Sequence, residues 1–275
     1  MLIPNLSNYS SSYKIMPTVQ HHWKSRFVAA GIHLGISLGL AALAAALVFS
    51  VWYPYPYREI SGGRSLFFLV VAVDVVMGPL LTLVIFNRSK PISELRRDLA
   101  LIGVLQLAAL GYGLWTVALA RPVHLVFEMD RFRAVHAFEV TPESLKHALP
   151  SWQQLPLTGP TLLSVRDFKN SDESFALTNA AFEGTQIGAQ PGMWQDYEKA
   201  KPQILARARS LEDLKKRFPD RSADIDNALK SVSSADRPAT SVGYIPLVSR
   251  NTDFWTVLVD NHTAEVIAFV PIDSF

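Results

Sequence analysis

Cysteine is absent from all 275 residues of this chain. Disulfides, thiolate metal ligands and a cysteine nucleophile are therefore excluded. The seven histidines are scattered, and only His21 and His22 are adjacent, so their spacing predicts no metal site. The sequence also lacks a phosphate-binding G-x-x-x-x-G-K-[ST] loop, a dinucleotide-binding G-x-G-x-x-G loop and an H-E-x-x-H pair. These absences count against the common enzyme classes, and no cofactor is expected.

Charged residues are scarce in three long stretches of the first 120 residues. Residues 27–51 carry no formal charge, residues 66–86 carry one, Asp74, and residues 99–120 carry none. About 20 apolar residues, each rising about 1.5 Å, cross the ~30 Å hydrocarbon layer of a membrane. The sequence therefore predicts three transmembrane helices. The first run exceeds the apolar region of a signal peptide, about 7–15 residues, and follows a polar tail, so we expect an uncleaved anchor.

Lysine and arginine are unevenly distributed between the two sides of these predicted helices. The tail and the second connecting segment carry seven basic residues and the first connecting segment carries two: Lys14, Lys24, Arg26, Arg88, Lys90, Arg96 and Arg97 against Arg58 and Arg64. Cytoplasmic segments are the ones enriched in positive charge. We therefore expect a flexible cytoplasmic tail over residues 1–26, a three-helix transmembrane domain over residues 27–120, and residues 121–275 outside the cytoplasm.

The charge balance changes after the third predicted helix. From Arg121 onward the chain has 17 Lys and Arg against 20 Asp and Glu, although the whole chain has a formal net charge of +2. This part has no strongly basic face, so a nucleic-acid partner is not expected. Its length, about 155 residues, is enough to bury a sizeable core without disulfides.

Sequence patterns in this second part mix strands and helices. Alternating apolar residues over 123–138 predict a pair of strands, and two apolar runs around Asn261-His262 predict a hairpin. Residues 194–218 have helical spacing, with Pro202 either kinking the helix or starting its second half. The expected fold class is therefore a membrane α-helical part with three transmembrane helices plus a C-terminal α+β extracytoplasmic domain.

Asp74 needs a polar partner, because a carboxylate in mid-membrane costs about 2.5–3.5 kcal/mol on insertion scales. Counting residues from each expected membrane face places Asp74 level with Tyr112, and His33 level with Gln106. We predict two interhelical contacts, Asp74–Tyr112 and His33–Gln106. Such contacts either hold the bundle together or form part of a functional site, and the structural role is the simpler interpretation.

Small residues recur at a spacing of four in the first predicted helix, at Gly31, Gly35 and Gly39. This spacing lets the backbones of two helices approach closely. The glycine ladder either packs against the other helices of this chain or docks the helix of a partner. The sequence leaves both alternatives open.

Read in order, four segments resemble the TfpX/TfpZ family of type IV pilin accessory proteins. They are WYPYPY at 52–57, LFFLVVAVDVVMGPLLTLVIFN at 66–87, ELRRDLALIGVLQLAALGYGLWTV at 94–117 and ARPVHLVFEMDRFRAV at 120–135. The resemblance becomes thinner beyond the fourth segment and does not include the tail. The residues that match the family pattern, with no role assigned, are Asp74, Gly78, Pro79, Arg96, Arg97, Asp98, Arg121, Pro122, Phe127, Glu128, Asp130, Arg131 and Phe132.

The resemblance implies a multi-pass inner-membrane protein of a Gram-negative bacterium with its C-terminal domain in the periplasm. It implies a part in pilin stability, pilus assembly or the balance of extension and retraction in twitching motility. The implied partners are the major type IV pilin and inner-membrane components of pilus assembly, besides membrane lipid. The family brings no catalytic residue, so a non-enzymatic role is expected. The alternatives are a membrane-bound pilin-modifying enzyme and an envelope sensor module, although neither a donor site nor a cytoplasmic output domain is visible in the sequence.

Two sets of residues are candidates for contact with a pilin. One would hold the pilin helix in the bilayer, and the other would hold its globular head where the periplasmic domain leaves the membrane. The charges of the second set are otherwise those of an ordinary turn between strands. The candidates are Gly31, Gly35 and Gly39 for the helix and Glu128, Asp130 and Arg131 for the head.

Overall fold

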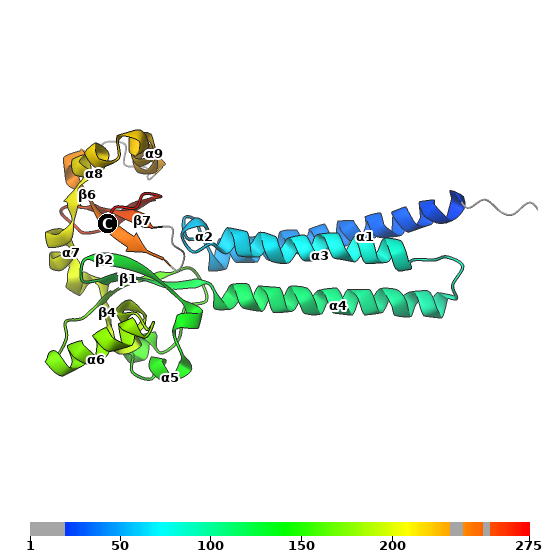
Figure 1. The fold of residues 1–275 in the computed structure, drawn as a ribbon, viewed down its shortest axis with the longest axis horizontal. Helices are drawn as coiled ribbons and strands as arrows, with labels where there is room; N and C mark the ends of the chain where they lie inside the picture. The colour runs from blue at the N-terminus through cyan, green and yellow to red at the C-terminus, as the bar shows by residue number, and fades with distance from the viewer. Residues whose placement is uncertain (1–19, 232–238, 250–253) are drawn as a thin grey trace, which may run out of the picture.

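A computed structural model describes residues 20–231, 239–249 and 254–275 as a long helical bundle joined to an α+β domain (Figure 1). The helices are α1 (Gln20–Leu47), α2 (Tyr57–Ile60), α3 (Gly63–Ile85), α4 (Ile92–Leu119), α5 (Pro142–Leu145), α6 (Ser171–Phe182), α7 (Lys201–Arg207), α8 (Leu211–Arg217) and α9 (Ser222–Ser231). The strands are β1 (Pro122–Glu128), β2 (Arg131–His136), β3 (Thr161–Val165), β4 (Trp194–Asp196), β5 (Arg209–Ser210), β6 (Val242–Val248), β7 (Trp255–Asp260) and β8 (Val266–Val270).

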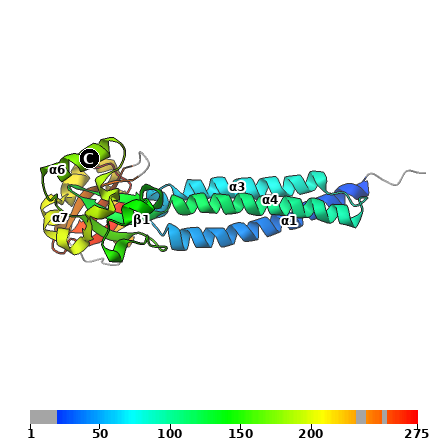
Figure 2. The ribbon, with the colours of Figure 1, turned by 90° about the horizontal axis from the view of Figure 1, so that it is seen from below.

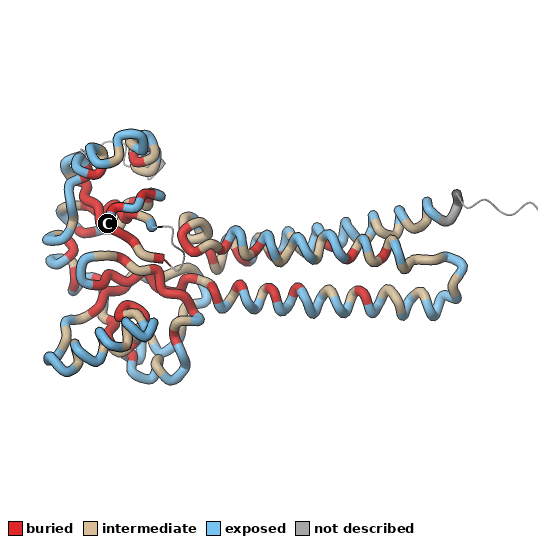
Figure 3. Tube along the Cα trace, viewed as in Figure 1, coloured by how far each residue is buried: buried red, intermediate tan, exposed pale blue. Residues whose placement is uncertain are grey.

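Helices α1, α3 and α4 form the bundle, and each is long and apolar enough to cross a membrane. Most residues of these helices are exposed or only partly buried (Figure 3), and many of their large apolar residues are among the exposed ones. A helix that is apolar on its outer face is suited to lipid. The predicted fold class, three transmembrane helices plus a C-terminal α+β domain, is confirmed. Residues 1–19, most of the expected tail, lie outside the described residues.

The helices begin earlier than their charge-free runs suggest. Helix α1 starts at Gln20 and α4 starts at Ile92, each seven residues before the run that predicted it. Charged residues can occupy the ends of a spanning helix because the ends reach the headgroup layer. The chain therefore stays helical beyond the hydrocarbon, and residue counts made from the charge-free runs start at the wrong place.

Helix α3 packs against both α1 and α4, and the three helices run side by side away from the domain (Figure 2). Buried Ala44, Val48, Phe67 and Val117 form a small apolar core at the end of the bundle nearest the domain. Further along, the contact of α3 with α4 depends on Gly113, because a Cβ there would overlap the side chain of Val70.

The domain is built on one mixed, eight-stranded sheet. Its strand order is β4-β3-β1-β2-β6-β7-β8, and β5 pairs with β6. The predicted strand pair is the antiparallel hairpin β1–β2, and the predicted C-terminal hairpin is β7–β8, so both predictions are confirmed. Strand β1 runs parallel to β3, and β2 runs parallel to β6. Figure 1 shows α5 and α6 toward one end of this sheet and α8 and α9 toward the other.

One continuous helix over residues 194–218 is not observed, but the alternative that Pro202 starts a helix in the second half of this segment is confirmed. Trp194 to Asp196 form the short strand β4, which pairs with β3, and α7 and α8 are separated by β5. Pro202 lies in the first turn of α7, where a missing N–H costs nothing. Trp194 is buried, and its ring lies edge-on to that of His124 with centroids 4.5 Å apart. Burial in the sheet therefore overrides helical spacing here.

The aromatic segment after α1 joins the bundle to the domain. The Tyr53 hydroxyl donates a hydrogen bond to the Val117 carbonyl of α4 at 3.0 Å, and Tyr53 is fully buried. The Tyr57 ring meets that of Phe269 edge-on at 5.5 Å, and Tyr55 remains 68% exposed. Two of the three tyrosines thus fasten the joint between the bundle and the domain.

Candidate functional site

Among the described residues, polar contacts join α3 to both α1 and α4. Gln106 Nε2 on α4 donates a hydrogen bond of 2.9 Å to the Asp74 carbonyl of α3, and Gln106 and His33 face the Asp74 side chain. His33 Nδ1 and Thr82 Oγ1 lie 2.5 Å apart and connect α1 to α3. The predicted pairs Asp74–Tyr112 and His33–Gln106 do not occur among the described residues. Tyr112 is 69% exposed, and His33 and Gln106 each bond to a residue of α3 instead.

Both pairs were predicted by counting residues from the ends of the charge-free runs, which are not the ends of the helices. Measured from the ends of the α3–α4 connection, Asp74 lies eleven residues before Ile85 and Gln106 lies fourteen residues after Ile92. At about 1.5 Å per residue these two residues are within about 5 Å of the same height. Tyr112 lies twenty residues after Ile92, about 30 Å along α4, and so is far from Asp74.

Thr82 is the polar residue of this set that sequence reasoning missed. Asp74, Gly78 and Thr82 follow one another at intervals of four and therefore share one face of α3. Gln106 occupies the space beside Gly78, where a Cβ would overlap its amide. The polar and small residues of α3 thus form a stripe that faces α1 and α4, and that spacing was the available signal.

The glycine ladder of α1 does not pack inside the bundle. A Cβ built on Gly31, Gly35 or Gly39 would have no described atom within 4 Å outside the helix itself. Ser37, between two of these glycines, is buried at 5% exposure and lies in mid-helix. The run Gly35-Ile36-Ser37-Leu38-Gly39 matches the letters of a serine nucleophile motif, but that motif requires a strand-to-helix turn. The ladder therefore presents an open face to its surroundings.

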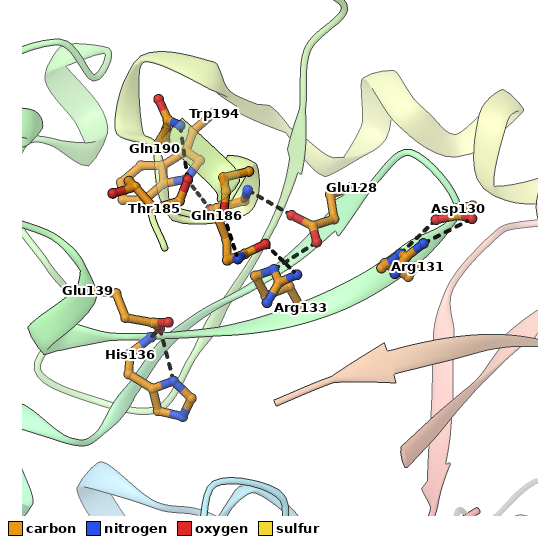
Figure 4. Close-up of polar contacts among 12 residues, drawn as sticks. Glu128, Asp130, Arg131, Arg133, His136, Glu139, Thr185, Gln186, Gln190 and Trp194 are labelled. Atoms are coloured by element: carbon orange, nitrogen blue, oxygen red, sulfur yellow. Dashed lines mark hydrogen bonds and ion pairs between the residues drawn. The ribbon is translucent and has the colours of Figure 1, made fainter. Parts of the chain in front are cut away.

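Glu128 is a structural residue rather than a free contact residue. Its side chain is 5% exposed and accepts a 2.7 Å hydrogen bond from Arg133 Nε, while its second oxygen accepts one of 2.7 Å from the Gly188 N–H (Figure 4). Trp194 Nε1 donates to the Gly188 carbonyl at 2.9 Å. The carboxylate thus ties the β1–β2 hairpin to the short helical turn at Ile187–Ala189, which corrects its proposed place in a partner interface.

Asp130 is exposed and Arg131 is partly buried at the turn of the β1–β2 hairpin, and the two pair with each other, with Arg131 Nε 2.8 Å from Asp130 Oδ1. That ion pair lowers the pKa of the Asp130 carboxyl below its usual value. Strand β1 has seven residues, about 23 Å, between the end of α4 and this turn. The turn therefore lies at the far end of the hairpin from the bundle, not where the domain meets it (Figure 1).

His124 is a buried titratable group near the joint. Its ring Nδ1 lies 2.6 Å from Thr161 Oγ1, its Nε2 has no hydrogen-bond partner among the described residues, and the residue is 1% exposed. Burial lowers the pKa of His124 to about 4. The imidazole is thus held neutral, and protonating it requires part of the domain to open.

The domain should lose stability in mild acid because of His124. Its folded-state pKa of about 4 lies below the ordinary value of 6.5, so the unfolded chain binds the proton more readily as the pH falls from 6.5 to 4. The free energy of unfolding should decrease by about 3 kcal/mol across that window. In thermal melts at pH 7 and pH 4.5, His124→Gln should show a smaller acid loss than the unchanged chain. Exposed His147→Gln should not, and equal acid losses for all three chains would contradict the prediction.

Chemistry-bearing clusters are few in the part of the chain that the structure describes. No group of three or more His, Cys, Asp or Glu side chains that could hold a metal ion occurs among these residues. The ionic side chains near the α5–α6 surface pair with each other, as Arg166 does with Glu173 at 2.7 Å.

Comparison with known proteins gives consistent matches. Residues 21–62 match the family described as Fimbrial assembly protein FimB. The fimbrial assembly protein of Dichelobacter nodosus serogroup I is 38% identical over 257 residues, which cover 92% of this chain and 98% of that protein. The serogroup E1 protein of the same organism is 36% identical over the same shares of both chains. No solved structure matches the chain.

These matches extend over almost the whole length of both relatives, from the bundle into the domain. They confirm the resemblance to pilus accessory proteins at the level of fimbrial assembly. The chain belongs to the fimbrial assembly protein family.

Proposed function

We propose that this chain is a non-enzymatic accessory protein of type IV pilus assembly that holds the major pilin in the inner membrane before its incorporation. The three long helices would lie in the bilayer with α1 starting in the cytoplasm, and the α+β domain would lie in the periplasm. The excess of basic residues at the far end of the bundle supports this orientation. Relatives named for fimbrial assembly support the process.

The open glycine ladder is the observation that carries the proposal. Gly31, Gly35 and Gly39 lie on a helix whose other face already packs on α3, and no described atom fills the space beside them. A bare backbone stripe of this kind lets a second helix approach closely, which in lipid is a main source of helix association. A pilin waiting in the membrane has such a helix, so α1 can receive it.

The joint between bundle and domain lets one chain hold a partner at two levels. The Gly159 N–H donates to the Val51 carbonyl at 2.8 Å, and Arg121 at the end of α4 donates to the Pro156 carbonyl at 3.2 Å. These bonds fix the domain directly above the bundle. A pilin helix against α1 would therefore place the pilin head beside the domain, within reach of its exposed residues.

Replacing Gly35 with leucine tests the helix contact. In cells that make the major pilin, a tagged full-length chain should capture pilin after solubilisation in mild detergent. Gly35→Leu should lower the captured amount about ten-fold, because a side chain at the centre of the ladder blocks close backbone approach. The fold should be unaffected, since the position is open.

Gly111→Leu is the matched control. Gly111 lies on α4 and is equally open, so leucine there adds the same apolar bulk to the bundle surface away from the ladder. It should leave pilin capture unchanged. The proposal fails if the unchanged chain captures no pilin, or if the two leucine variants reduce capture equally.

A further inference from the structure

A cavity of about 700 Å³ opens between α1, α3 and α4 at the end of the bundle farthest from the domain. Its walls are apolar, with Val28, Ile32 and Ile36 on α1 and Leu99 on α4. Gly103 contributes a stretch of bare backbone, since nothing described lies within 4 Å of a Cβ built there. The volume lies within the range of about 300–1,000 Å³ that is usual for a small-molecule site.

Two cations line the mouth of this cavity. Lys24 comes from the first turns of α1, and Arg88 comes from the connection between α3 and α4. Both side chains are exposed, and neither has an acidic partner among the described residues. Lys90 differs from them, because it is already paired with Asp98 at 2.6 Å. The mouth therefore presents free positive charge above an apolar interior.

The length of the cavity matches one leaflet of a bilayer. From Lys24 to Ile36 is twelve residues along α1, about 18 Å, whereas the hydrocarbon core is ~30 Å thick and the headgroups add several more on each side. A partner helix that crosses the membrane needs a groove along the whole bundle. An acyl chain with its headgroup needs only one leaflet.

We propose that this cavity binds an anionic phospholipid, with an acyl chain between Ile32, Ile36 and Leu99 and its phosphate between Lys24 and Arg88. Basic pockets between transmembrane helices attract anionic headgroups. His33 and Thr82, which pair with each other, form the polar part of the lining at greater depth. The inference depends on the bundle lying in a membrane and is independent of pilin binding.

Lipid-dependent melting of the delipidated full-length chain in detergent tests the proposal. Phosphatidylglycerol should raise the melting temperature in a saturable way, and phosphatidylcholine should not. Lys24→Gln with Arg88→Gln should weaken the apparent affinity for phosphatidylglycerol about ten-fold or more, since two charge contacts are lost. The double variant should melt at the unchanged temperature without lipid, because neither side chain has an acidic partner among the described residues.

Two controls separate this site from general attraction to a charged surface. Arg96→Gln with Arg97→Gln removes two cations from the same end of the bundle but outside the cavity lining, and it should keep the response to phosphatidylglycerol. Ile32→Trp should fill the cavity and abolish the response, whereas Leu43→Trp, at an exposed position of α1 away from the cavity, should not. Equal responses to both lipids, equal losses for the two charge variants, or retention of the response in Ile32→Trp would each overturn the proposal. So would recovery of a protein partner in the cavity in place of lipid.

Discussion

Replacing Glu128 with alanine should lower the free energy of unfolding of the domain by about 3–5 kcal/mol. The carboxylate is 5% exposed and Arg133 is 13% exposed, so the substitution leaves a guanidinium with little access to water. It also leaves the buried Gly188 N–H without its acceptor, and an unsatisfied buried donor has its own cost. Thermal or denaturant unfolding of the full-length chain, followed by tryptophan fluorescence, would measure the change.

Matched variants distinguish this network from a general effect of lost charge. Asp130→Ala removes a carboxylate two residues away that is itself exposed and pairs with the neighbouring Arg131, and it should change stability by less than about 1 kcal/mol. Adding Arg133→Met to Glu128→Ala should recover part of the loss, because the stranded cation is gone. A Glu128→Ala chain as stable as Asp130→Ala would show that the ion pair observed here contributes nothing.

The membrane part of the fold could be predicted because its signal is simple. Runs of about 20 residues without charge are typical of transmembrane helices, so three helices long and apolar enough to cross a membrane could be predicted from the sequence. Hairpin β7–β8 was equally easy to predict, because two alternating apolar runs flank a short polar turn. These elements are determined by local patterns, and local patterns are visible in a sequence.

The contacts between elements were harder to predict from the sequence. The role of Glu128 depends on Gly188, which lies 60 residues away in a helical turn that the fold brings against β1, β2 and β3. The partner of Gln106 depends on where each helix begins, and charged helix ends hid that point. Strand β4 was concealed because Trp194 lies in a segment with helical spacing that the sheet overrides. In each case the decisive fact is a long-range distance rather than a residue type.

Gly113→Leu should disrupt the packing of α4 on α3 and lower the stability of the bundle by about 3 kcal/mol, the upper part of the range for overpacked sites. A Cβ at this position already overlaps the Val70 side chain, so a longer side chain has to separate the two helices. The contact of Gln106 with Asp74 would then lengthen, because it bridges the same pair of helices. The melting temperature of the full-length chain in detergent measures the effect.

Gly111→Leu supplies the comparison, since it adds the same side chain two residues away where no described atom lies within 4 Å. Its melting temperature should stay close to that of the unchanged chain, because a leucine that faces lipid or detergent is in an apolar environment.

A second test replaces Gly113 with alanine, the smallest possible change. Gly113→Ala alone should destabilise, and Val70→Ala in the same chain should restore most of the loss by vacating the overlapping space. If Gly113→Leu and Gly111→Leu melt alike, or if Val70→Ala gives no recovery, the close approach of α3 and α4 at Gly113 is not what holds these helices together.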